Sequence, residues 1–218
     1  MSGVEVFAEE GYRVLDRARV DHLLSLGLLQ GRSILDVGSG GGGMTRLLRE
    51  TGLSVTASDA RPWLVAALPP PAVQIDIETV RLLARFDVVL AYGLLYHLAH
   101  PFSALAVMAH AADRVLVVET CVGEVNAFNL PEDAEDPRNG VRGLGCRPSR
   151  DWLQGQMSDL MPHVGWPVTQ PNHEEFPLDW RAPLGPGNHR CVVVGSRLPL
   201  NPAMFCSGPL DRHEVCRG

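Results

Sequence analysis

The sequence contains no lysine, because all 19 of its basic residues are arginine, and 25 acidic residues give it a net charge of −6. This balance disfavours a broad phosphate-binding surface, and with it a nucleic-acid partner. No apolar run approaches the ~20 residues that a membrane-spanning helix requires, so we expect no membrane partner. The five cysteines show no C-x-x-C spacing, and the N-terminus is polar and acidic. These features predict reduced thiols in a cytoplasmic protein rather than a disulfide framework or a zinc site.

Strand-like and helix-like patterns alternate through most of the chain, which is long enough for one domain. The expected strands cover 33–38, 53–60, 72–78, 86–93 and 114–122, and the expected helices cover 42–52, 61–68, 78–86 and 101–112. Strict alternation with short connections predicts the α/β class, with helices on both faces of a parallel sheet. Ligands of such sheets bind beyond the carboxyl ends of the strands.

Other segments flank this alternating region. Residues 4–29 show helical spacing, which predicts that 1–30 form an N-terminal helical cap on a main domain that covers 31–198. Residues 122–150 lack periodicity and are long for a connection, so we interpret them as a lid, a substrate loop or a disordered insert. Residues 149–166 predict a helix with Ser149 as N-cap, and 188–198 a last strand. The tail at 199–218 has little pattern, which is typical of a mobile terminus.

A glycine-rich loop at 38–43 fits two nucleotide-binding patterns. Gly38, Gly40 and Gly43 give G-x-G-x-x-G, and with Asp36 in front the same loop also reads D-x-G-x-G-x-G. Glycine permits positive φ and lets a ligand approach the bare backbone. Asp59 ends the second strand, where a carboxylate can accept both hydroxyls of a ribose. The loop therefore predicts a nucleoside ligand of one of two kinds.

Asp36 favours a cationic ligand over a pyrophosphate. Its carboxylate would repel phosphate and attract an α-amino group next to a sulfonium, by roughly a few kcal/mol at ~4 Å before desolvation. Asp76 follows the third strand, where it could accept the amino group of an adenine while Ile77 packs on the ring. Each acid has a structural alternative, since Asp36 could cap the loop amides and Asp76 could cap a following helix.

Four segments in this order resemble the motifs of class I S-adenosylmethionine-dependent methyltransferases: "LDVGSGGG", "VTASDA", "VQIDIE" and "FDVVLAYGLLYHLAHP". The resemblance implies a Rossmann-like, doubly wound, mostly parallel seven-stranded sheet, with 188–198 as its antiparallel last strand. It also implies S-adenosylmethionine as cofactor and S-adenosylhomocysteine as product. The residues that we expect to bind the cofactor are Asp36, Gly38, Ser39, Gly40, Asp59, Ala60, Asp76, Ile77, Ala91 and Tyr92.

Methyl transfer to a hydroxyl requires alignment and the removal of a proton. His97 follows the fourth strand, beside the expected methyl position, and is the candidate general base; mere packing is the alternative. Glu119 ends the fifth strand and is the second catalytic candidate. It could bind the acceptor hydroxyl, orient His97 or hold a divalent cation, and the alternative is a purely structural capping role. Tyr96, His173 and His189 are expected to line the acceptor pocket. Since the spacing shows no ligand pattern, we predict no metal, although converging carboxylates and imidazoles would suit a divalent cation.

The expected reaction is O-methylation of a small polar molecule, such as a sugar or a natural product. One alternative is a nicotinamide-dependent oxidoreductase, which usually uses a Tyr–Lys pair and is disfavoured by the missing lysine. A second alternative is a domain that keeps the methyltransferase fold but only binds a partner. The intact glycine loop disfavours this alternative, since a domain without catalysis need not keep it. The segment "GLLYHL" also occurs in enzymes that alkylate the wobble uridine of tRNA. The net negative charge of this chain disfavours a tRNA substrate. The sequence does not decide the oligomeric state, and a homodimer is compatible with it.

Overall fold

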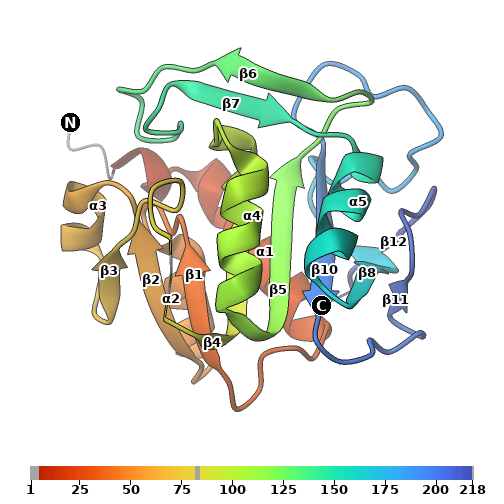
Figure 1. The fold of residues 1–218 in the computed structure, drawn as a ribbon, viewed down its shortest axis with the longest axis horizontal. Helices are drawn as coiled ribbons and strands as arrows, with labels where there is room; N and C mark the ends of the chain where they lie inside the picture. Colours follow the sequence, from red (N-terminus) through yellow and green to blue (C-terminus); the bar gives the residue numbers. More distant parts are fainter. Residues whose placement is uncertain (1–4, 82–83, 218) are drawn as a thin grey trace.

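One central sheet organises the fold, with its strands in the order β11-β8-β10-β5-β4-β1-β2-β3. The computed structural model describes residues 5–81 and 84–217 (Figure 1). The strands of this sheet are β1 (Ser33–Val37), β2 (Ser54–Asp59), β3 (Ala72–Gln74), β4 (Phe86–Tyr92), β5 (Ala112–Cys121), β8 (His163–Pro167), β10 (Arg190–Ser196) and β11 (Phe205–Cys206). β1 pairs in parallel with β2 and β4, whereas β10 is antiparallel to both β5 and β8. This confirms the predicted mostly parallel sheet with an antiparallel last strand, to which β11 adds an eighth strand.

Helices cover both faces of the sheet. On one face lie α1 (Glu10–Ser25) and α2 (Gly43–Glu50), and on the other lie α4 (Pro101–Ala111) and α5 (Arg150–Leu160), while α3 (Pro62–Ala67) packs beside β2 and β3 (Figure 1). Successive strand residues serve opposite cores because side chains alternate across a strand. In β1, Ile34 packs with the α1–α2 side and Leu35 with the α4–α5 side, both buried. The doubly wound prediction is therefore confirmed.

Three local predictions differ from the structure. The expected helix at 78–86 is replaced by turns in its described part, while residues 82 and 83 lie outside the described residues. The helix expected at 149–166 ends at Leu160, and β8 follows, because Trp166 is drawn into the core and its indole donates to Gln154 at 2.6 Å. The tail is packed rather than mobile. Its β11 pairs with β8, and its β12 (Glu214–Val215) pairs with β9 (Thr169–Gln170).

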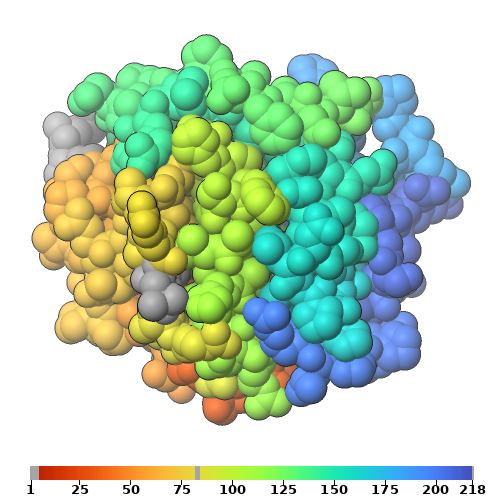
Figure 2. All heavy atoms as spheres, viewed as in Figure 1, coloured from red at the N-terminus to blue at the C-terminus, as the bar shows by residue number. Residues whose placement is uncertain are grey.

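The segment at 122–150 forms an antiparallel hairpin of β6 (Ala127–Pro131) and β7 (Leu144–Arg147). It lies above the carboxyl ends of β4 and β5, along the upper edge of the molecule (Figures 1 and 2). β7 rests on the short helix η2 (Leu95–His97), where the Cys146 thiol donates to the Leu95 carbonyl at 3.3 Å. A second short helix, η1 (Glu5–Ala8), precedes α1. Among the described residues, no helix combines the length and apolar character needed to cross a bilayer.

Candidate active site

Three adjoining pockets lie beyond the carboxyl ends of β1, β2 and β4. The inner pocket contains Asp16, Asp36 and Tyr92, and the side pocket contains Asp59, Ala60, Asp76 and Ile77. The outer pocket, of about 480 Å³, contains Tyr12, Tyr96, His97, Glu132, Arg147 and His173. The glycine loop separates the inner pocket from the side pocket, since both are lined by Gly38 and Gly40. The predicted ligand edge of the sheet is therefore hollow.

The glycine loop turns sharply between β1 and α2. Gly38 and Gly40 have φ values of +73° and +52°, a region that residues with a Cβ rarely adopt. A Cβ on Gly40 would also stand 3.1 Å from the ring of Phe7. The Gly40 amide donates to the carboxylate of Asp59 at 3.1 Å, and the Arg61 amide donates to the same group at 2.9 Å. The loop thus fixes the acid that was predicted to hold a ribose.

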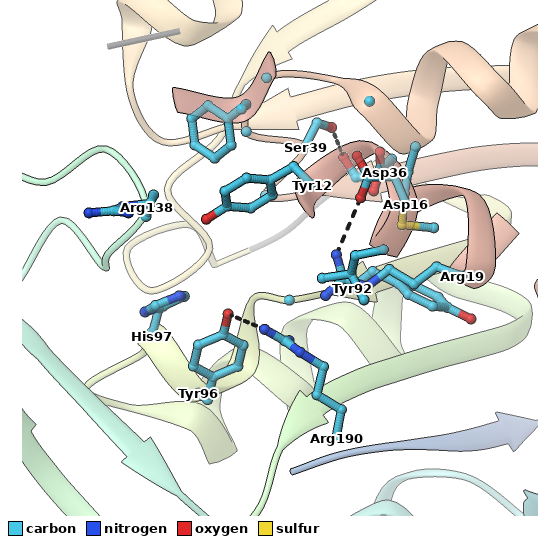
Figure 3. A pocket seen from close by; sticks show the side chains of 18 residues that line it. Tyr12, Asp16, Arg19, Asp36, Ser39, Tyr92, Tyr96, His97, Arg138 and Arg190 are labelled. Atoms are coloured by element: carbon cyan, nitrogen blue, oxygen red, sulfur yellow. Dashed lines mark hydrogen bonds and ion pairs between the residues drawn. The ribbon is translucent and has the colours of Figure 1, made fainter. Parts of the chain in front are cut away.

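Two acids line the inner pocket, the buried Asp36 and the partly buried Asp16. The Asp36 carboxylate accepts the Thr45 hydroxyl at 2.5 Å, and Ser39 donates to the Asp36 carbonyl at 2.9 Å. Burial raises the pKa of Asp36, and it also raises the pKa of Asp16, which α1 brings to the same pocket (Figure 3). Asp16 pairs with Arg19 at 3.3 Å, while Asp36 has no ion-pair partner among the described residues. A cationic group in this pocket would meet two carboxylates.

Asp16 escaped the sequence analysis because it belongs to the N-terminal helix. Its only sequence signal is the three-residue spacing to Arg19, which is also common on solvated helix faces. Figure 3 shows Asp16, Arg19 and Asp36 at one end of the inner pocket and His97 at the other, with Tyr12 reaching in between.

Besides the loop glycines, the side pocket holds four of the residues predicted to bind the cofactor, and a fifth lies elsewhere. Asp59, Ala60, Asp76 and Ile77 line the side pocket, but Ala91 is fully buried inside β4 and lines none of the three pockets. The small side chain of Ala91 packs in the core, so the structure does not place it at the predicted cofactor site. Asp76 accepts the Glu78 amide at 3.0 Å and pairs with Arg142 at 3.0 Å. Its carboxylate therefore already makes the turn contacts that the capping alternative described.

Tyr92 lines the inner pocket from the end of β4. Its hydroxyl is buried and finds no hydrogen-bond partner within residues 5–81 and 84–217. Burial raises the pKa of this phenol, so the ring stands in the pocket wall as a neutral group.

His97 connects the three pockets, since it lines each of them. Its Nδ1 lies 2.8 Å from the Glu132 carboxylate, and the two side chains are only 14% and 11% exposed. Glu132 also accepts the Gly140 amide at 3.1 Å. Burial raises the pKa of Glu132, but the hydrogen bond and the charge of His97 outweigh it, so the net shift is downward. With Nδ1–H directed at a carboxylate, Nε2 is the free acceptor nitrogen of His97.

Glu119 does not act as predicted. It is fully buried, with its carboxylate 2.7 Å from Arg19 and 3.0 Å from Arg190. It also accepts the amide of Gly93 at 2.7 Å. Burial raises the pKa of Glu119, but the two guanidinium charges hold the net value below the ordinary range. Both of its oxygens are occupied and it lines none of the three pockets, so Glu132 takes the position beside His97 that was expected for Glu119.

The predicted acceptor residues divide into two that line the outer pocket and one that does not. Tyr96 and His173 line it, whereas His189 bonds to the Gly185 carbonyl at 2.7 Å away from these cavities. The Tyr96 hydroxyl accepts from Arg190 at 3.2 Å, and burial raises the pKa of Tyr96 to about 12. His189 was expected to face the pocket because it precedes the last strand, but its imidazole turns back onto its own loop.

Two arginines bind the loop between β6 and β7 to residues of the side pocket. Arg61 donates to three carbonyls of this loop, those of Ala134, Asp136 and Asn139, at 2.9 to 3.2 Å. Arg142 pairs with Glu78 at 3.0 Å as well as with Asp76. The loop that carries Glu132 is therefore held by residues next to the predicted ribose and adenine acids.

No group of three or more His, Cys, Asp or Glu side chains is arranged for a metal ion in the part of the chain that the structure describes.

The chain resembles known methyltransferases in sequence and in fold. A family model described as "Methyltransferase domain" matches residues 7–170. A tRNA U34 carboxymethyltransferase of Haemophilus influenzae (strain PittEE) is 34% identical over 121 residues, covering 48% of this chain and 38% of that protein. This chain therefore spans well under half the length of that relative.

Two solved structures share most of the fold. The N-terminal domain of EvdMO1, solved in the presence of S-adenosylhomocysteine and D-fucose, gives a TM-score of 0.65 at 20% identity, over 86% of this chain and 84% of that one. Magnesium protoporphyrin IX methyltransferase from Synechocystis PCC 6803, solved with bound S-adenosylmethionine, gives 0.59 at 14% identity, over 91% and 85%.

The sheet order, the glycine loop and the rim acids define a class I S-adenosylmethionine-dependent methyltransferase. The chain belongs to the methyltransferase-domain family, whose model covers residues 7–170. This confirms the resemblance seen in the sequence and sets aside the nicotinamide oxidoreductase.

Proposed function

We propose that the protein methylates a hydroxyl of a small polar molecule, with His97 as the general base. The observation that carries this proposal is the place of His97, which lines the inner, side and outer pockets together. When bound, S-adenosylmethionine supplies an electrophilic methyl group for in-line displacement from its sulfonium. An acceptor in the outer pocket would reach that methyl group beside the imidazole.

The residues of the inner and side pockets fit this cofactor. Asp36 and Asp16 would hold its α-amino group, because both carboxylates line the inner pocket and Asp36, which is buried, has no cationic partner among the described residues. Asp59 would accept the ribose hydroxyls, and the amides of the glycine loop would lie against the methionine part. Ile77 would pack on the adenine, next to Asp76.

Glu132 orients the imidazole of His97 for its role as a general base. Its carboxylate accepts a hydrogen bond from Nδ1–H and leaves Nε2 to accept the proton of the acceptor hydroxyl. Since the pKa of Glu132 is lowered, this carboxylate stays ionised and stabilises the imidazolium that forms. Such a positioned base typically contributes about 10²- to 10⁴-fold to the rate.

The outer pocket suits a small polar acceptor. Its volume of about 480 Å³ and its lining of tyrosine, histidine, arginine and glutamate side chains match a sugar-sized, hydrogen-bonding molecule. The similar EvdMO1 domain was solved in the presence of D-fucose, which supports a sugar acceptor.

A tRNA acceptor is the second candidate, and the 34% identity to a tRNA U34 carboxymethyltransferase favours it. The net charge of −6 argues against it, because tRNA binding draws on many phosphate contacts. Incubation of the protein with S-adenosylmethionine and total tRNA, followed by nucleoside mass spectrometry, distinguishes the two. A modified wobble uridine would replace the small-molecule proposal.

The main test is a screen of hydroxylated sugars and natural products with methyl-labelled S-adenosylmethionine. NMR of any product locates the new methyl group, which we expect on oxygen. His97→Gln should lower kcat by about 10²-fold or more, with unchanged affinity for S-adenosylhomocysteine. The exposed His100 lines none of the three pockets, so His100→Gln is the matched control. Full activity of His97→Gln would contradict the general-base role.

A further inference from the structure

We propose that the acceptor carries an anionic group, a carboxylate or a phosphate, and that Arg147 binds it. The inference rests on the proposed function in one respect: it takes the outer pocket as the acceptor site. It adds a substrate class, because a neutral sugar or polyol would leave the strongest unused donor of this pocket without a partner.

The other two arginines of the outer pocket are already neutralised. Arg190 pairs with Glu119 and with Glu175, and Arg138 pairs with Asp136 at 2.6 Å. Their guanidinium charges are therefore used within the protein. Neither is available to an incoming anion without breaking an existing pair.

Arg147 differs from both. Among the described residues, no carboxylate oxygen lies within 4.0 Å of its guanidinium nitrogens, and its only hydrogen bond is donated to the Cys146 carbonyl at 2.9 Å. The side chain is half-buried, with its guanidinium carbon 4.9 Å from the centre of the Tyr96 ring. This cation–π contact holds the guanidinium over the ring and leaves its other N–H groups for a planar or tetrahedral anion.

The remaining acids of the pocket do not take the place of that anion. Glu132 is engaged by His97 and by the Gly140 amide. Glu9 and Glu174 are exposed, where water and salt screen their charges. Arg147 is therefore the arginine of this pocket wall that has no ion-pair partner among the described residues, and its charge acts on Glu132 only at longer range, where it helps to lower the pKa of that carboxyl.

Arg147 and His97 flank the same ring, which sets the spacing of the groups on the acceptor. The Tyr96 ring centre is 4.9 Å from the guanidinium carbon and 3.9 Å from the His97 ring centre. These two separations keep guanidinium and imidazole within about 9 Å of each other, which leaves room for two hydrogen bonds and only a short piece of ligand. The reacting hydroxyl should thus lie a few bonds from the anionic group, as in a hydroxy acid, a sugar acid or a sugar phosphate.

A binding titration tests the anion site without knowledge of the acceptor. Protein labelled with ¹⁵N-arginine and loaded with S-adenosylhomocysteine is titrated with sodium acetate and with inorganic phosphate at constant ionic strength. The Arg147 side-chain resonance, assigned by its loss in Arg147→Gln, should shift to saturation with at least one anion. The exposed Arg17 on α1 serves as reference. If Arg147 shifts no more than Arg17 with both anions, the proposal is wrong. The anion that saturates at the lower concentration separates a carboxylate from a phosphate.

An activity panel then tests the substrate class. D-glucose, D-glucuronate and D-glucose 6-phosphate, and comparable sets of other hydroxylated compounds, are offered with S-adenosylmethionine. We expect turnover to favour the anionic member of a set, and Arg147→Gln to raise its KM about 10-fold or more while Arg17→Gln does not. Equal use of the neutral member, or an equal loss for both members in Arg147→Gln, would overturn the inference. If Arg147 only kept Glu132 ionised, its replacement would lower kcat for all acceptors alike. Absence of any turnover would count against the proposed function, and the titration would still decide the role of Arg147.

Discussion

Two buried histidines should make this protein sensitive to mild acid. His22 on α1 bonds through Nε2 to the Thr169 carbonyl at 3.0 Å, and His213 bonds through Nδ1 to the Pro167 carbonyl at 3.0 Å. The second nitrogen of each ring is buried and has no partner among residues 5–81 and 84–217. Burial lowers the pKa of each from 6.5 to about 4, so the folded chain holds both rings neutral.

The sign and size of the effect follow from proton linkage. The unfolded chain takes up protons at these histidines below about pH 6.5, whereas the folded chain does so only near pH 4. The free energy of unfolding therefore falls as the pH drops through this window, and the loss levels off below it. Each histidine should account for about 2 kcal/mol of loss at about pH 5 and about 3 kcal/mol when the window has been crossed.

Urea denaturation at about pH 7 and about pH 5 measures this loss. His22→Gln keeps a donor that can reach the Thr169 carbonyl but cannot take up a proton, so its stability should fall less between the two pH values, by about 2 kcal/mol. His110→Gln, at the exposed end of α4, is the matched control and should behave like the parent. An equal fall in the parent and in His22→Gln would refute the reasoning.

Four further outcomes follow from the site and the core. Asp36→Asn should weaken binding of S-adenosylhomocysteine about 10- to 100-fold by calorimetry, because an amide cannot offset the cationic amino group. Arg61→Gln should increase hydrogen exchange in the loop between β6 and β7, since the three carbonyl contacts are lost; unchanged exchange would show that other contacts suffice. Tyr92→Phe should raise the free energy of unfolding by up to about 1 kcal/mol, because it removes a buried hydroxyl without a partner. Tyr96→Phe should instead lower it, as it removes the bond from Arg190.

The acid next to His97 shows where sequence reasoning reached its limit. Glu119 ends a strand on the ligand edge, so it was a reasonable candidate, but Arg19 and Arg190 neutralise it from α1 and β10. Glu132 lies in a stretch without periodicity, 35 positions from His97, and no local pattern marks it. The hairpin that delivers it folds back over η2 through contacts that only the assembled sheet provides.

The sequence by itself determined the class of fold and most of the cofactor edge. Strand and helix periods are local, and parallel strands bring their carboxyl ends to one edge, so the sequence pattern alone places Asp36, the glycine loop and Asp59 at the same edge. The tertiary structure alone decided which charges compensate each other. Asp16 acquires its role beside Asp36, Glu132 beside His97 and Arg147 beside Tyr96, all neighbours distant in the chain. Electrostatic pairing depends on distances in space that sequence spacing does not encode.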